Sequence, residues 1–181
     1  MSNLEQLKSK YAPIIQQIID NNSIFFRFEA PVRWEFFEDQ NRAITARVDN
    51  YALKINIRSI IFAYEVKNEP LQIEYFILHE IRHLYQRLAI LSYKKQSTPV
   101  NHQIERWKVE FENYLPPQIN TAEYYKQMIE FDAFAFSYSV MLFKYGPVPY
   151  IQPPQFYIEN YPDEFKFAID KYLQNFKEFV G

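Results

Sequence analysis

Residues 71–91, with the sequence LQIEYFILHEIRHLYQRLAIL, decide how the chain folds. Large aliphatic side chains recur every three or four positions along this stretch: Ile73, Ile77, Ile81, Leu84, Leu88 and Leu91. Such spacing predicts a long helix that turns one face toward a hydrophobic core. His79 and His83 fall on the opposite side of this helix, where they could line a cleft.

The two histidines belong to the run His79-Glu80-Ile81-Arg82-His83, which has the form HExxH. Two imidazoles one helical turn apart can reach a single zinc ion at about 2.0–2.1 Å. Glu80 is rotated by roughly 100° about the helix axis and can reach a water on the metal instead. The run therefore predicts a zinc hydrolase with His79 and His83 as ligands and Glu80 as general base. The alternative is a pair of ordinary surface histidines.

A catalytic zinc usually has three protein ligands and one open position for water. The longer pattern HExxHxxGxxH is absent, because Gln86 and Ala89 occupy the positions of its Gly and last His. The chain has no Cys, which excludes thiolate ligands and disulfides. We therefore expect the third ligand to be a carboxylate on a later helix.

The strongest candidates for that carboxylate are Glu130 and Asp132, the only charged residues between Gln127 and Phe143. A carboxylate buried in so apolar a stretch is costly unless it has a partner, and a zinc ion is one such partner. We favour Glu130 as the ligand. Asp132 is then expected to orient a histidine N–H, although the reverse assignment is open.

Each of the two carboxylates also has a purely structural alternative. Glu130 or Asp132 could pair with Arg82 or Arg87, or simply lie exposed to solvent. His102 is a weaker candidate for the third ligand, because it falls near the start of a predicted helix, where exposure is the more common outcome.

The segment before residue 71 predicts a small, mostly antiparallel sheet of three or four strands. An amphipathic helix is expected first, over residues 2–20. Four short segments, rich in aromatic and β-branched residues, then follow: SIFFRFE (23–29), VRWEFFE (32–38), AITARV (43–48) and ALKINIRSII (52–61). With the helices that follow, this pattern indicates an α+β fold.

Three more helices are predicted on the C-terminal side. The first covers residues 101–115 and is stopped by Pro116. The second begins at Thr121, a candidate N-cap, and runs to about Tyr145. The last is amphipathic and covers residues 162–179. A helical half therefore carries both the HExxH helix and the carboxylate-donating helix.

The composition fits one domain over residues 1–181, because 48% of the residues are hydrophobic. The formal net charge is -2 and the basic residues are spread out, so no direct nucleic-acid partner is expected. The first residues carry no apolar signal core, and no stretch approaches ~20 apolar residues. These features predict a cytoplasmic protein without a membrane span, and they give no indication of the oligomeric state.

Three segments resemble the ImmA/IrrE-type metallopeptidases and related small metallopeptidase domains: LKIN (53–56), FILHEIRHLYQ (76–86) and EFDAFAFSYSVML (130–142). The resemblance implies a zincin-like fold with a gluzincin-like site, whose ligands are His79, His83 and Glu130, with Glu80 as base. It also implies cytoplasmic proteolysis of a regulatory protein. Arg82 departs from the pattern, since the family often has Gly at this position.

The leading hypothesis is thus a zinc-dependent peptidase acting on a protein or peptide. In such an enzyme, Tyr85 and Tyr138 are candidate donors to the oxyanion of the tetrahedral intermediate. One alternative is a catalytically inactive zincin-fold binding or regulatory module of a phage or mobile element. Another is a zinc hydrolase of a non-peptide amide. Manganese or nickel could also bind such a set of ligands.

Overall fold

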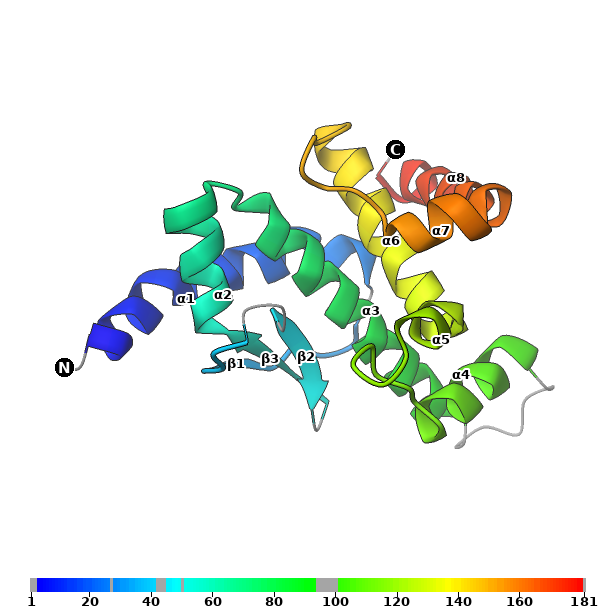
Figure 1. Ribbon diagram of the computed structural model, residues 1–181, viewed down its shortest axis with the longest axis horizontal. Coiled ribbons are helices and arrows are strands. Elements are labelled where there is room, and N and C mark those ends of the chain that lie inside the picture. The colour runs from blue at the N-terminus through cyan, green and yellow to red at the C-terminus, as the bar shows by residue number, and fades with distance from the viewer. Residues whose placement is uncertain (1–2, 27, 42–44, 50, 94–100, 181) are drawn as a thin grey trace. The chain divides into compact units, whose positions relative to one another are not determined.

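The computed structural model describes residues 3–26, 28–41, 45–49, 51–93 and 101–180. Three short strands come early and helices dominate the rest, so the fold class is α+β, as predicted (Figure 1). The chain divides into two compact units, Met1–Ile81 and Arg82–Gly181, and the division falls inside one continuous helix. The single domain expected from the sequence stays a prediction. No helix in the described stretches is both long and apolar enough to cross a membrane.

The first unit begins with helix α1 (Asn3–Asn22), which confirms the helix predicted over residues 2–20. Tyr11, Ile15 and Ile19 recur at helical spacing and are buried on one face.

A strand was expected next over residues 23–29, but Ser23–Phe25 form a 3-10 turn, η1, instead. The helix ends at the buried Asn22, whose amide donates to the carbonyl of Ile18. Phe26 is buried directly after the turn and stacks on Phe28. The prediction was wrong because aromatic residues favour a half-buried surface, which a turn can provide as well as a strand.

The sheet consists of β1 (Trp34–Phe37), β2 (Ala46–Asp49) and β3 (Ala52–Asn56), with β3 in the centre. β2 pairs antiparallel with β3, whereas β1 pairs parallel with it. The sheet is therefore mixed, and not mostly antiparallel as expected. The reason is that β3 returns between β1 and β2, which places its fully buried Leu53 and Ile55 in the central strand.

The predicted strand over residues 52–61 ends at Asn56, where a short helix, α2 (Ile57–Ile61), begins. The side chain of Asn56 is fully buried and caps α2 by accepting the N–H of Arg58 at 3.1 Å. Its amide also donates to the carbonyls of Asp39 and Asn41. A π-helical segment, η2 (Phe62–Lys67), follows α2 and ends at Asn68, which has a left-handed conformation.

Helix α3 (Leu71–Tyr93) confirms the long helix predicted from the aliphatic spacing. Ile73, Ile77 and Ile81 are buried, as expected of a core-facing stripe. The histidines on the other side are also buried, with exposed fractions of 4% for His79 and 7% for His83. The structure therefore rules out the alternative of two ordinary surface histidines.

The second unit contains the end of α3 and five further helices: α4 (His102–Glu112), α5 (Thr121–Lys126), α6 (Met128–Tyr145), α7 (Gln155–Asn160) and α8 (Pro162–Val180). Helix α6 is central, because it packs along α8 and against α4 and α5 (Figure 1). The helices predicted over residues 101–115 and 162–179 are confirmed as α4 and α8.

The single helix predicted from Thr121 to about Tyr145 is broken at Gln127, which has an extended backbone. The cap of α5 is Asn120, whose side chain accepts the N–H of Glu123, and not Thr121. The break is stabilised by the Gln127 amide, which bonds to both the N–H and the carbonyl of Leu115. A new helix, α6, therefore starts at Met128, two residues before Glu130.

Candidate metal centre

Two helices carry the candidate centre. Helix α3 places His79 and His83 one turn apart on one face, and α6 carries Glu130 in its first turn. Glu130 is fully buried, and the two histidines are buried as well. One ligand atom from each of the three residues lies within 4.8 Å of the others. This buried His79–His83–Glu130 group, here called the Glu130 cluster, could hold a metal ion.

The hydrogen bonds around Glu130 fix its place in the cluster. Its Oε1 atom lies 3.3 Å from Nε2 of His83 and accepts the hydroxyl of Tyr114 at 3.0 Å. The backbone N–H of the preceding residue, Ile129, donates to Oε2 of Glu110 on α4 at 2.9 Å. Glu110 thereby satisfies one of the free N–H groups at the start of α6.

Glu80 lies beside the cluster in the sequence and outside the group of ligand atoms. It is half-buried on α3, next to His79 and rotated from it by roughly 100° about the helix axis. The role of Glu80 as general base stays a prediction. The weaker candidate, His102, is an exposed residue at the start of α4 and also lies outside the cluster.

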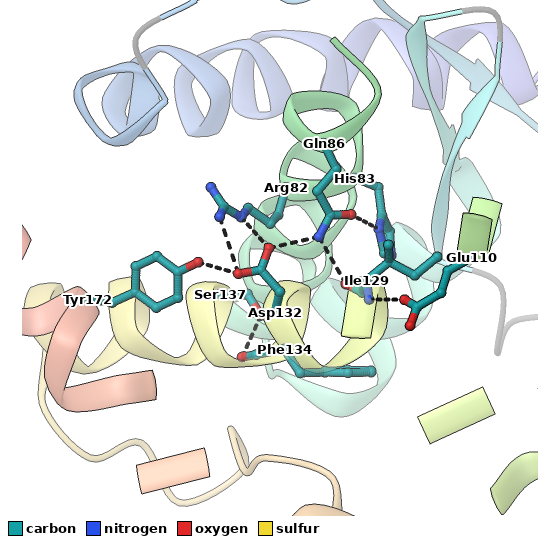
Figure 2. Close-up of polar contacts among 9 residues, drawn as sticks. All are labelled: Arg82, His83, Gln86, Glu110, Ile129, Asp132, Phe134, Ser137 and Tyr172. Carbon is teal, nitrogen blue, oxygen red and sulfur yellow. Dashed lines mark hydrogen bonds and ion pairs between the residues drawn. The ribbon is translucent and has the colours of Figure 1, made fainter. Parts of the chain in front are cut away.

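Asp132 points toward Arg82, Tyr172 and Gln86 (Figure 2). Arg82 donates from Nε to one carboxylate oxygen at 2.8 Å and from Nη2 to the other at 3.2 Å. The hydroxyl of Tyr172 and the amide of Gln86 also donate to this carboxylate. The structural alternative considered for Asp132, pairing with Arg82, is therefore the observed one. These four residues are called the Asp132 cluster below.

Two members of the Asp132 cluster, Arg82 and Tyr172, have raised pKa values. Burial alone would lower the pKa of the Arg82 guanidinium, but the charge of Asp132, the neighbouring Tyr172 and the hydrogen bond to Asp132 together outweigh it, and the pKa is raised. Four aromatic rings surround the guanidinium within 6 Å of its carbon: Tyr85, Trp107, Phe136 and Tyr172. Burial, and then the charge of Asp132, raise the pKa of Tyr172 well above its ordinary value. Its hydroxyl therefore stays a donor.

Gln86, a member of the Asp132 cluster, connects it to the Glu130 cluster. This fully buried side chain donates from Nε2 to Asp132 at 2.7 Å and to the carbonyl of Ile129 at 3.1 Å. Its Oε1 atom lies 2.9 Å from Nδ1 of His83. Sequence reasoning considered Gln86 only as the residue that replaces a glycine. Its position three residues after His83, on the same helical face, was the available signal.

Tyr114 is the second residue that the sequence did not reveal. Its side chain is on the loop after α4, where the residue is 41% exposed, yet its hydroxyl reaches the buried Glu130. The next residue, Leu115, is held by the Gln127 amide. Of the tyrosines that were expected as donors, Tyr85 lies against Arg82, and Tyr138 lies about two helical turns beyond Glu130 on α6.

Comparisons with protein-family models, with curated proteins and with solved structures gave no significant match. The function is therefore inferred from the residues of the site and their contacts.

Proposed function

We propose that this protein is a zinc-dependent peptidase with a zincin-like fold, similar to the ImmA/IrrE-type metallopeptidases. The observation that carries the proposal is the convergence of His79, His83 and Glu130 in the buried Glu130 cluster. Two imidazoles and one carboxylate are a common ligand set of catalytic zinc, which leaves a fourth position for water.

The spacing of one pair of ligand atoms is compatible with a bound zinc ion. Atoms that bind a tetrahedral ion at about 2.1 Å lie roughly 3.4 Å from one another. Nε2 of His83 and Oε1 of Glu130 are 3.3 Å apart, so this pair needs almost no rearrangement. Zinc also suits imidazole and carboxylate donors, whereas thiolate sites are excluded by the absence of Cys.

The roles of the chain's own residues follow from their positions. A zinc ion bound in the cluster would lower the pKa of a water and polarise the scissile carbonyl. Glu80 would take the proton from that water and pass it to the leaving amine. Tyr114, whose hydroxyl lies beside the ligand oxygen of Glu130, would donate to the oxyanion that forms at the carbonyl.

The substrate we propose is a protein or peptide, and more narrowly a regulatory protein. The support for this class is the resemblance of the HExxH helix and of residues 130–142 to the ImmA/IrrE-type peptidases. The inactive binding module is the alternative, and it differs in one respect that can be measured: it would hydrolyse no peptide, with or without bound zinc.

The test is hydrolysis of a mixed peptide library by the zinc-loaded protein, with new termini identified by mass spectrometry. Glu80→Gln should bind as much zinc as the wild type and cleave about 100-fold more slowly or worse. Tyr114→Phe should also keep its zinc and lose about 100-fold in kcat. Glu69→Gln, the same change just before α3, is the matched control and should cleave normally.

Two results would count against this function. Zinc binding without any cleavage would favour the binding module. If Glu80→Gln cleaved peptides as fast as the wild type, Glu80 would not be the general base.

A further inference from the structure

A row of aromatic rings begins at the candidate metal centre. Its first member is Tyr114, whose hydroxyl donates to Oε1 of Glu130 at 3.0 Å. The ring of Tyr124 on α5 meets that of Tyr114 edge-on, with the two centroids 6.4 Å apart. The row continues through Tyr125 to Phe156 on α7, with centroid separations of 5.0 and 5.4 Å. Tyr114, Tyr124, Tyr125 and Phe156 are called the aromatic row below.

Every residue of the aromatic row is partly exposed to solvent. Tyr114 is 41% exposed, and the other three residues are half-buried. The row is anchored on the core at Tyr125, whose ring lies 6.0 Å from that of the buried Phe134 and 5.5 Å from that of the buried Tyr157. A partly exposed aromatic residue still has apolar area that a ligand can bury. The row therefore offers a binding surface that is backed by the core.

The start of the aromatic row is fixed by one buried side chain, Gln127. Its amide bonds to the N–H and the carbonyl of Leu115, the residue after Tyr114, at 3.0 and 2.9 Å. The same amide donates to the carbonyl of Tyr124 at 3.2 Å. The segments that carry the first two rings are thus tied to each other. A surface formed in advance in this way lowers the entropic cost of binding a ligand.

The chemistry of the row favours a large apolar group as its ligand. Aromatic rings attract one another beyond the effect of buried area. Glu123 and Lys126 are the only charged residues of α5, and they pair at 2.7 Å, so this helix adds no net charge beside the rings. A basic side chain can also lie over a ring, but a zinc ion bound by Glu130 would repel it.

We propose that the aromatic row is the substrate subsite for a large apolar side chain, such as Phe, Tyr or Leu, beside the scissile peptide bond. Its place beside the bond follows from Tyr114, whose hydroxyl lies at a ligand oxygen of the Glu130 cluster. The cleavage specificity rests on the proposed function. The binding of an apolar side chain to the row does not.

The first experiment measures specificity as a ratio. For the zinc-loaded wild type, kcat/KM should be at least about 10-fold higher for peptides with Phe next to the scissile bond than for those with Ala. Tyr124→Ala should lower this ratio about 3–10-fold and keep its zinc. Tyr145→Ala, the same change at the far end of α6, should alter neither quantity. A ratio near 1 in the wild type, or an unchanged ratio in folded Tyr124→Ala, would overturn the proposal.

The second experiment needs no cleavage. The probe is a capped pentapeptide of alanine with Phe at its centre, titrated into the metal-free protein, and the readout is NMR of the aromatic side chains. We expect the ring resonances of Tyr124, Tyr125 and Phe156 to shift with this peptide and not with the all-alanine peptide. The absence of these shifts would overturn the subsite, and so would equal shifts with the two peptides.

The two proposals can fail separately. Cleavage without a preference for large apolar side chains would keep the peptidase and overturn the subsite. Selective binding of the Phe peptide by a protein that cleaves nothing would keep the aromatic row as a binding surface and remove the peptidase. If Tyr124→Ala does not fold, the ratio and the ring shifts of the wild type still decide the question.

Discussion

Glu130 and Asp132 lie two residues apart on α6, yet they belong to two different environments. Successive residues of a helix are rotated by about 100°, so these carboxylates leave the helix in nearly opposite directions. Glu130 meets two imidazoles and a tyrosine hydroxyl, whereas Asp132 meets a guanidinium, an amide and a tyrosine hydroxyl.

The difference between the two clusters is the source of positive charge. Asp132 faces Arg82, whose charge is permanent and is supplied by the chain itself. Glu130 faces histidines, which carry a positive charge only when they are protonated. The Asp132 cluster is thus suited to stabilising the fold, and the Glu130 cluster is suited to receiving a cation from solution.

The largest effect expected from this comparison is on stability. Asp132→Ala would leave the charged guanidinium of Arg82 buried without its carboxylate. We expect the free energy of unfolding of the metal-free protein to fall by about 3–5 kcal/mol, measured by urea denaturation. Glu130→Gln is the matched change in the other cluster and should cost far less in the same measurement. If both variants lost the same free energy of unfolding, the Asp132 cluster would not be more important to stability than the Glu130 cluster.

The converse effect is expected on metal binding. Glu130→Gln replaces a ligand carboxylate by an amide, and zinc affinity should fall by more than about 100-fold, beyond the effect of losing an outer partner. Chelator competition measures this loss directly. Asp132→Asn, which keeps the shape of that side chain, should lose no more than about 10–100-fold. If Asp132→Asn lost more zinc affinity than Glu130→Gln, Glu130 would not be the metal ligand.

The smallest effect concerns Tyr172 at alkaline pH. Its pKa is raised in the folded protein, whereas in the unfolded chain it ionises near pH 10. The folded state therefore holds this proton more tightly, and stability is lost as the pH rises above about 10. Tyr172→Phe should lower the free energy of unfolding by about 2 kcal/mol at pH 8. Between pH 8 and pH 11, the free energy of unfolding should fall less in this variant than in the wild type. A parallel pH dependence in the two proteins would contradict the raised pKa.

Much of the helical framework could be predicted because its signals are local. The spacing of apolar residues predicted α1, α3 and α8, whereas α4 ends at Glu112, three residues before the end that Pro116 predicted. The failures arose where a side chain bonds to a distant part of the chain. Asn56 ended a predicted strand, and Gln127 divided a predicted helix, through contacts with residues 12 to 17 positions away.

The site shows the same limit. His79 and His83 could be predicted as a pair because the HExxH spacing is local, and Glu130 because it is a carboxylate in an apolar helix. The sequence left the pairing of Asp132 with Arg82 as one alternative among several, since these residues are 50 positions apart. Gln86 and Tyr114 were missed for a related reason: polar side chains of these types are common, and only their contacts distinguish them.

The most direct test of the central claim is the amount of zinc bound by the purified protein after incubation with zinc, measured by elemental analysis. The Glu130 cluster predicts about one zinc per chain in the wild type and in Asp132→Asn, and none in His83→Ala. A wild type that binds no zinc, or a His83→Ala protein that retains it, would contradict the assignment of this site.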